Sequence, residues 1–336
     1  MTERLHILLL GASGFVGRAL LREFASMPAG SVRVRALLRA PDALPDYPFL
    51  DKVRGDLARP PLGLEPEQPY VLVHFAVKQI DHDGTGFIAT NVDATRRLLR
   101  GLGPRLRGVI YGSSMSVYGQ DEQDGISEIA APNPGTALAH SRHLAERLVG
   151  NVARQREIPA YLLRPRFVLG EGDRFVLPSL ARMVQKRVRI GSGRQRFSVI
   201  DVDDYACAIS RLAQRIIAGA PGAVPKQEVL NVGYGQPVAC ADLLDELAAA
   251  LDAPKAIWRL PVSRRLTLTL RRLPFSGSTA LATRLELVGL PHWGEVDALG
   301  ELVGRDLTSR DPLAAVRSAA RALRQGRATP ETKHTT

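Results

Sequence analysis

The stretch Leu5-His-Ile-Leu-Leu-Leu10-Gly11-Ala-Ser-Gly14-Phe-Val-Gly17 decides the fold of this 336-residue chain. Residues 5–10 form a continuous apolar run, as expected of a parallel strand that is covered on both faces. Three glycines follow at a regular spacing, and residues 15–27 carry apolar side chains at helical intervals. A strand that passes through a glycine turn into a helix is typical of the βαβ unit that binds the diphosphate of a dinucleotide.

Each glycine of this turn has its own physical task. Gly11 permits the tight turn, Gly14 lets the backbone approach a diphosphate, and Gly17 lets the helix pack closely on the strand. The free N–H groups and the positive dipole end of the helix then face the anion. The cofactor-binding residues that the sequence predicts here are Gly11, Ser13, Gly14, Phe15, Val16 and Gly17.

Short apolar runs alternate with helical patterns through the first half of the chain. Further strands are predicted at residues 32–38, 71–75, 108–113 and 160–164, with helices at 91–101 and 141–156. This alternation predicts an α/β fold with a Rossmann-type, doubly wound parallel sheet. We expect a nucleotide-binding domain over 1–166 and a smaller C-terminal substrate-binding region over 167–327. Segments such as 231–233 are expected to rejoin the sheet, and the polar tail 328–336 is expected to be disordered.

The end of the second predicted strand bears on the choice between NAD and NADP. A carboxylate at that point would hold the ribose 2′-hydroxyl of NAD. The sequence instead reads Ala36-Leu-Leu-Arg39-Ala-Pro, with no acid before Asp42. Because a guanidinium pairs with phosphate in a bidentate fork, Arg39 favours NADP over NAD, with an ordinary surface arginine as the alternative.

Composition excludes several classes of protein. The chain is 45% apolar and 24% charged, as in globular proteins, and its two cysteines exclude a disulfide framework. No metal site is predicted. The longest apolar runs are too short to span a membrane, and the first leads into glycines rather than a cleavage segment, so we expect a cytoplasmic protein. The net charge of +11 fits an anionic small molecule, nucleic acid or an arginine-rich surface.

Several motifs occur in a fixed order and together carry a specific resemblance. They are Gly55-Asp56-Leu57, His74-Phe-Ala76, Asn91-Val-Asp-Ala-Thr95, Ser113-Ser-Met-Ser-Val-Tyr118-Gly119, Arg164-Pro-Arg-Phe-Val-Leu-Gly170, Asp203-Asp-Tyr-Ala206 and Asn231-Val-Gly233. From about residue 5 to about residue 251, the chain resembles the extended short-chain dehydrogenase/reductases, which are the NAD(P)-dependent epimerases and dehydratases.

The resemblance implies functions for the matching residues. Ser114 matches the position of the family's catalytic serine. The resemblance also implies a homodimer, formed through two helices of the nucleotide domain. The cofactor contacts that it implies beyond the glycine turn are Asp56, Leu57, Phe75, Ala76, Arg142, Pro165 and Val168. The residues expected to contact substrate are Lys78, Ser114, Met115, Leu138, Arg166 and Arg196.

The chain departs from the family pattern at its central acid. The family carries Tyr-x-x-x-Lys on one helix face, where Tyr exchanges a proton with the carbonyl oxygen and Lys holds the nicotinamide ribose. Here the matching positions are Leu138 and Arg142. Leucine has no proton to donate, and arginine stays charged at neutral pH. A histidine could supply the proton near neutral pH, but His140 points to another helix face, so a substrate hydroxyl or water is an alternative proton source.

Three functions remain open on this evidence. The first is an NADP(H)-dependent ketoreductase that acts on a small, phenolic or polyketide-like carbonyl compound. The second is a nucleotide-sugar epimerase or dehydratase, for which Arg166, Arg174, Arg194 and Arg196 could hold a diphosphate. The third is a non-catalytic NADP-binding module. For all three we expect a small-molecule ligand and neither nucleic acid nor membrane as a partner, because the arginine stripe predicted over 312–327 fits a solvated helix face.

Overall fold

The computed structural model describes residues 4–81, 84, 86–219, 227–273 and 278–328. Its centre is a seven-stranded sheet in the order β12-β7-β5-β4-β1-β2-β3, and all its strand pairs are parallel. The chain moves outward from β1 to β3 and then crosses back to β4, so β1 and β4 flank the point where the strand order reverses. The strands are β1 (Leu5–Leu10), β2 (Val32–Leu38), β3 (Leu50–Arg54), β4 (Tyr70–His74), β5 (Leu106–Gly112), β7 (Ala160–Pro165) and β12 (Gln227–Val232).

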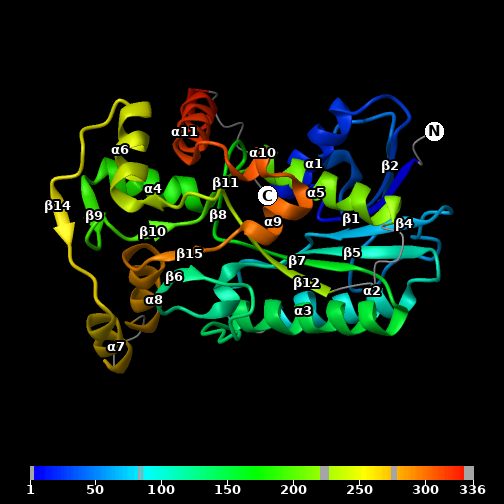
Figure 1. Ribbon diagram of the computed structural model, residues 1–336, viewed down its shortest axis with the longest axis horizontal. Coiled ribbons are helices and arrows are strands. Elements are labelled where there is room, and N and C mark those ends of the chain that lie inside the picture. The colour runs from blue at the N-terminus through cyan, green and yellow to red at the C-terminus, as the bar shows by residue number, and fades with distance from the viewer. Residues whose placement is uncertain (1–3, 82–83, 85, 220–226, 274–277, 329–336) are drawn as a thin grey trace.

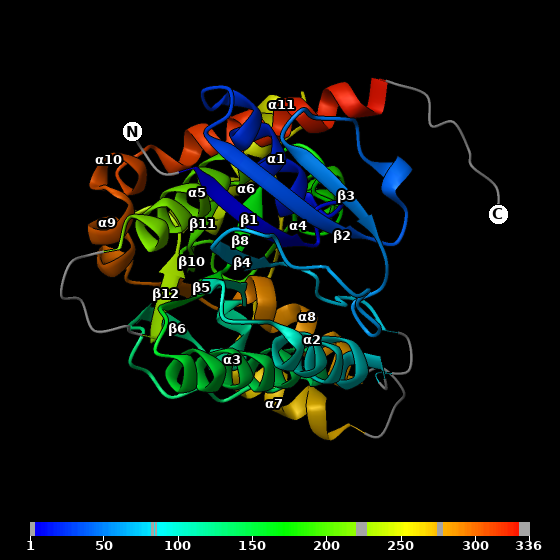
Figure 2. The same ribbon diagram turned by 90° about the vertical axis from the view of Figure 1, so that its right-hand side faces the viewer.

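Helices cover both faces of this sheet, which confirms the predicted doubly wound fold (Figures 1 and 2). One layer contains α1 (Phe15–Ser26) and α5 (Val202–Ala218), and the other contains α2 (Thr95–Gly101) and α3 (Ala137–Arg156). Strand β1 shows why both layers are apolar. Ile7 and Leu9 pack into the core on the α1 and α5 side of the sheet, and Leu8 and Leu10 pack into the core on the α2 and α3 side.

The C-terminal part of the chain lies at one end of the large sheet (Figure 1). Its strands are β8 (Phe167–Leu169), β9 (Val188–Ile190), β10 (Arg196–Phe197), β11 (Val199–Asp201), β13 (Val238–Ala239), β14 (Trp258–Leu260) and β15 (His292–Gly294). Its helices are α4 (Val176–Gln185), α6 (Cys240–Ala250), α7 (Arg264–Arg272), α8 (Ser278–Gly289), α9 (Asp297–Val303), α10 (Arg305–Thr308) and α11 (Pro312–Ala328). Strand β6 (Gln123–Ile126), from the first half of the chain, pairs with β15. Strand β12 lies beyond residue 166 but pairs with β7, so the carboxyl-terminal half contributes to the large sheet.

Two helices begin earlier than the sequence indicates. Helix α3 starts at Ala137 rather than at 141, because the Thr136 hydroxyl caps it by accepting the N–H of Ala139 at 3.1 Å. The helix predicted over 91–101 starts with a π-helical segment, η2 (Ile88–Ala94), which continues into α2. Short 3-10 turns, η1 (Pro41–Ala43) and η3 (Met115–Tyr118), complete the elements.

The remaining expectations concern the tail, metals and membranes. Ala328 is the last residue of α11, and the rest of the predicted tail, 329–336, lies outside the described residues. Within the described residues, no cluster of three or more His, Cys, Asp or Glu could hold a metal ion. None of the described helices has the length and apolarity that crossing a membrane requires.

Candidate active site

The turn between β1 and α1 leaves no room for side chains at two of its glycines. Gly11 has a φ of +87°, and a Cβ there would lie 2.7 Å from the carbonyl carbon of Phe75. A Cβ on Gly17 would lie 2.2 Å from the Gly11 carbonyl oxygen. The turn is closed by a hydrogen bond from the Gly14 N–H to that same oxygen at 2.9 Å. Backbone therefore packs directly on backbone at the switch point of the sheet.

The start of α1 has the properties of a diphosphate site. Gly14 occupies the N-cap and supplies no side-chain acceptor, and the first turn contains no acid. Phe15 and Val16 are half-buried, while Ser13 is exposed and its carbonyl accepts a hydrogen bond from Arg18 Nε at 3.0 Å. The N–H groups and positive helix end are thus free of a competing side chain, which fits the diphosphate of a nicotinamide dinucleotide.

The predicted adenosine contacts lie at the ends of neighbouring strands. Arg39 follows β2, is exposed, and has no hydrogen-bond or ion-pair partner among the described residues. The turn after β3 is held to β2 by a hydrogen bond from the Gly55 N–H to the Leu38 carbonyl at 2.9 Å. Within it, the exposed Asp56 carboxylate accepts the Ala58 N–H at 2.7 Å, and Leu57 is half-buried. The structure therefore brings Arg39 and the Asp56–Leu57 turn to one edge of the sheet.

The predicted nicotinamide contacts come from strand ends nearer the centre. Phe75 and Ala76 follow β4, and the Phe75 ring packs edge-on against Tyr205 with centroids 5.8 Å apart. A Cβ on Gly112 would lie 2.4 Å from the Phe75 ring, so glycine at the end of β5 makes room for it. Pro165 ends β7 and Val168 lies in β8, and both are half-buried.

The first turns of α3 carry Leu138 and Arg142, which the sequence predicts at the positions of the family's Tyr and Lys. Leu138 is half-buried, and Arg142 follows one helical turn later, buried. The Arg142 guanidinium donates through Nη1 to the Ser113 carbonyl at 2.8 Å, while its buried Nε has no partner among the described residues. Burial lowers the pKa of Arg142. The Arg142 cation is therefore held at the end of β5, one helical turn from Leu138, whose side chain cannot donate a proton.

Ser114 caps the 3-10 turn η3 and keeps its hydroxyl proton available. Its Oγ accepts the Ser116 N–H at 3.1 Å, and the side chain is half-buried. An oxygen that accepts in this bond still has its hydrogen to donate to a substrate carbonyl. Met115, which the sequence predicted as a substrate contact, is completely buried, because it packs into the interior beneath this turn.

Asn91 ties the site together in a way that its motif alone did not reveal. Its Nδ2 donates to Ser141 Oγ at 2.9 Å, and its Oδ1 accepts the Lys78 N–H at 2.8 Å. Ser141 in turn donates to the Leu138 carbonyl at 2.8 Å. The Lys78 ammonium pairs with Asp81. One buried asparagine therefore fixes the loop after β4 against the start of α3.

A buried ion pair anchors α3 to β7. Arg164 makes two hydrogen bonds to Glu146, at 2.8 and 2.6 Å, and both side chains are 3% exposed. Burial alone would raise the pKa of Glu146, but the hydrogen bonds from Arg164 hold it below its usual value. The Arg164 guanidinium also lies over the Tyr118 ring, whose hydroxyl donates to Asn231 Oδ1 at 2.9 Å. Tyr118 thus has a structural contact on both its ring and its hydroxyl.

Three predicted site residues are directed elsewhere. His140 is exposed on the outer face of α3, away from the face shared by Leu138 and Arg142. Arg166 donates to the Leu287 carbonyl at 2.8 Å, and burial lowers its pKa to about 9. Arg196 pairs with Asp124 at 2.9 Å and stacks on the Trp293 ring. Both arginines are therefore engaged with acceptors of the chain itself.

Comparison with known proteins agrees with this geometry. The model of the NAD dependent epimerase/dehydratase family matches residues 7–233. The chain is 28% identical over 284 residues to a 2-alkyl-3-oxoalkanoate reductase of Stenotrophomonas maltophilia, covering 75% of this chain and 77% of that protein. It is 26% identical over 269 residues to a UDP-glucose 4-epimerase of Vibrio cholerae, covering 76% of this chain and 78% of that protein.

A solved structure shares the fold across nearly the whole chain. MoeE5 in complex with UDP-glucuronic acid and NAD superimposes with a TM-score of 0.72 and 22% identity, covering 96% of this chain and 99% of that one. The family match spans the glycine turn, the Ser113–Gly119 segment and the strand that carries Asn231. The protein therefore belongs to the NAD-dependent epimerase/dehydratase family, whose members use a nicotinamide dinucleotide.

Proposed function

We propose that this protein is an NADP(H)-dependent ketoreductase that reduces a carbonyl of a small apolar or phenolic metabolite without a tyrosine acid. The observation that carries the proposal is Leu138, half-buried on the same face of α3 as the buried Arg142. The dinucleotide turn retains its glycines and close packing. A site that holds the cofactor but has no tyrosine suits a substrate that needs no strong acid from the enzyme.

The chain's own residues then do three things. When bound, the nicotinamide supplies the hydride. Ser114 donates a hydrogen bond to the carbonyl oxygen, and the charge of Arg142 at the end of β5 favours negative charge developing nearby. The proton comes from water or from a hydroxyl that the substrate carries beside its ketone. Leu138 contributes an apolar surface where the family pattern has its acid.

The choice of NADP rests on Arg39. Its guanidinium is exposed at the end of β2 and unpaired among the described residues. A 2′-phosphate on the adenosine ribose would give it a charge-assisted partner. NAD remains the alternative.

The nucleotide-sugar epimerase or dehydratase is the second candidate, since such epimerases are among the relatives. It requires oxidation and reduction at one sugar carbon, for which Leu138 offers no base. Arg166 and Arg196 also bind acceptors within the chain, so they are less available to hold the diphosphate of a nucleotide sugar. The 2-alkyl-3-oxoalkanoate reductase among the relatives favours the ketoreductase. A non-catalytic NADP-binding module is the third candidate.

Absorbance of NADPH at 340 nm separates these candidates. Incubation with a panel of aromatic ketones and 3-oxo acids should consume NADPH, with a ketone-dependent rate. NADPH binding without turnover on any ketone would favour the non-catalytic module. Preferential binding of UDP- or dTDP-sugars would favour the epimerase.

Restoring the family pair tests the placement of Leu138. The double variant Leu138→Tyr, Arg142→Lys is expected to bind NADPH with an affinity within about fivefold of the wild type, because the glycine turn is unchanged and lysine keeps a cation at the expected cofactor contact Arg142. Fluorescence titration of NADPH measures this. A complete loss of binding in a folded double variant would contradict the alignment on which the proposal rests.

A further inference from the structure

Exposed apolar side chains are concentrated in one segment of the C-terminal part. Among the described residues, thirteen large apolar side chains are exposed, and eight of them fall between residues 257 and 287. In this segment α7 packs on α8, and both α8 and β14 contact β9. We call the exposed surface of β14, α7 and α8 the β14–α7–α8 face. Its exposed members are Ile257, Trp258, Leu260, Leu266, Leu268, Leu273, Leu281 and Leu287. Soluble proteins rarely gather so many such side chains without a partner for them.

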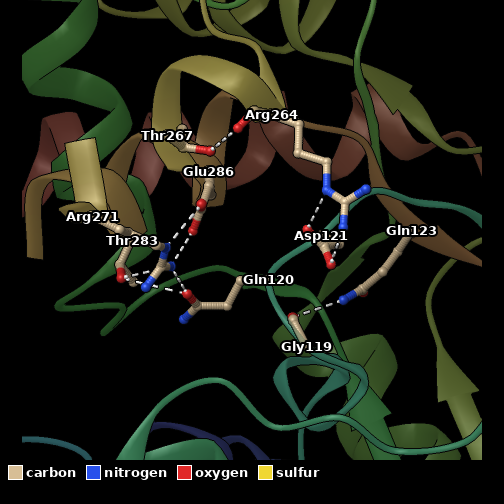
Figure 3. A network of polar contacts seen from close by, with 9 residues as sticks. All are labelled: Gly119, Gln120, Asp121, Gln123, Arg264, Thr267, Arg271, Thr283 and Glu286. Atoms are coloured by element: carbon tan, nitrogen blue, oxygen red, sulfur yellow. Dashed lines mark hydrogen bonds and ion pairs between the residues drawn. The ribbon is translucent and has the colours of Figure 1, made fainter. Parts of the chain in front are cut away.

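Helix α7 buries polar side chains and leaves leucines exposed beside them. Thr267 is completely buried, whereas Leu266 and Leu268, to either side of it on the helix, are 39% and 43% exposed. Figure 3 shows that the inward residues make a polar network, in which Arg271 meets Glu286, Thr283 and Gln120. A surface helix usually buries its apolar side and exposes its polar side. In α7 the network occupies the inward side, and the flanking leucines stay exposed.

The same segment carries most of the excess charge of the chain. Residues 255–289 contain seven Lys and Arg and one acid, so their net charge is 7 − 1 = +6, against +11 for the whole chain. The one acid, Glu286, is bound by Arg271. Four exposed arginines have no side-chain partner among the described residues, namely Arg259, Arg265, Arg272 and Arg284.

The arginines of α11 provide an internal contrast. Arg317 pairs with Glu246 and Asp311, and Arg324 pairs with Asp252. That stripe is largely neutralised by the chain itself, as a solvated face would be. Of the seven cations in the segment 255–289, Arg259, Arg265, Arg272 and Arg284 have no such partners among the described residues, so these four are available to an external anion.

We infer that the β14–α7–α8 face binds peripherally to an anionic lipid surface. An apolar face flanked by arginines, with tryptophan among its exposed members, matches a surface that lies in the headgroup layer of a membrane. Anionic headgroups attract the arginines, and the leucines enter the acyl boundary. A second copy of the chain fits less well, because a symmetric contact would bring two sets of four unpaired arginines together.

This surface lies beside the segment that carries the catalytic serine position. Arg264 pairs with Asp121 at 3.1 Å, and Arg271 reaches Gln120, which follows Gly119 directly (Figure 3). Docking would therefore bring the Ser113–Gly119 side of the site towards the lipid. The sequence alone predicts no membrane contact, because its apolar runs are too short for a span and the arginine stripe of α11 fits a solvated face. The inference is independent of the ketoreductase proposal.

Vesicle co-sedimentation of the full chain tests the inference. One set of vesicles contains phosphatidylcholine with about 30% phosphatidylserine, and the other contains phosphatidylcholine alone. The wild type should sediment with the anionic vesicles and not with the neutral ones. The pair Arg265→Glu, Arg272→Glu should weaken binding by at least about 25-fold, since each basic residue near such a surface contributes roughly fivefold. The pair Leu266→Ser, Leu273→Ser should weaken it by at least roughly tenfold.

Matched controls keep the result interpretable. Leu62→Ser and Arg321→Glu change an exposed leucine and an exposed arginine outside the face, and both should bind as the wild type does. Unchanged NADPH affinity and circular dichroism would show that the variants are folded. Failure of the wild type to bind anionic vesicles, or full binding by the leucine pair, would overturn the inference. Light scattering that shows a wild-type dimer dissociated by the leucine pair, without vesicle binding, would assign the face to a second copy instead.

Discussion

The turn between β1 and α1 and the first turn of α3 both contribute to the candidate site, yet they differ in what the fold requires of them. In the first, a Cβ at Gly11 or Gly17 would collide with backbone. In the second, Leu138 is half-buried and carries no hydrogen bond through its side chain. Dinucleotide binding is thus built from backbone packing, whereas proton donation depends on one replaceable side chain. A chain can therefore lose the family's acid and keep its cofactor site.

The largest expected effect on cofactor binding is at the glycine turn. Gly17→Ala places a methyl group 2.2 Å from the Gly11 carbonyl oxygen, so the turn and α1 must separate. We expect NADPH affinity to fall by at least about 100-fold and stability to fall by roughly 1–3 kcal/mol. Fluorescence titration and urea unfolding measure the two effects. Gly101→Ala, where an added Cβ meets nothing within 4 Å, is the control and should bind normally.

The next effect concerns the anchor of α3. Arg164→Met would leave the Glu146 carboxylate buried without its partner, which costs about 3–5 kcal/mol of unfolding free energy. The control is Arg22→Met, because Arg22 pairs with Asp203 at 2.7 Å on the surface and should contribute less than about 1 kcal/mol. Urea unfolding of both variants gives the comparison. Equal losses would mean that the buried pair does not hold α3 in place.

A smaller effect is expected at the adenosine end of the dinucleotide site. Arg39→Ala should reduce affinity for NADPH by about 10–100-fold, the range of one charge-assisted hydrogen bond, and leave NADH affinity unchanged. Arg33→Ala, an exposed arginine near the start of β2, should change neither. Titration with both dinucleotides measures the difference. An equal loss for NADPH and NADH would rule out recognition of the 2′-phosphate by Arg39.

The smallest expected effect is the change in the rate of ketone reduction when His140 is replaced. This histidine is exposed and two residues from Leu138, on a different face of α3, so His140→Ala should change the rate of ketone reduction by less than about twofold. Steady-state rates across neutral pH test this. A fall of tenfold or more would identify His140 as the replacement acid and would mean that the first turn of α3 has kept a proton donor.

The sheet and the glycine turn could be predicted because their patterns are local. Residues 5–17 contain strand, turn and helix start within one short stretch. The beginning of α3 could not be predicted as well, because its cap, Thr136, precedes a turn without clear apolar periodicity. The contact between Asn91 and Ser141 joins residues 50 positions apart, which no local pattern reveals.

The β14–α7–α8 face shows a second limit of sequence patterns. Hydrophobic periodicity assumes that apolar residues face the core. In α7 the buried residue is Thr267, while Leu266 and Leu268 beside it are exposed, because Arg271 and its polar partners occupy the space beneath the helix. The excess charge could be counted from the sequence, but only the fold shows which of its arginines lack partners.

The most direct test of the central claim compares two substrates that differ at one hydroxyl. A phenolic ketone with its hydroxyl beside the carbonyl and the same ketone as its methyl ether are each reduced with NADPH, followed at 340 nm. If the substrate supplies the proton that Leu138 cannot, the free phenol should react at least about 100-fold faster, in the range of general acid catalysis. Equal rates for the two ketones would contradict proton donation by the substrate hydroxyl and would assign the proton to water.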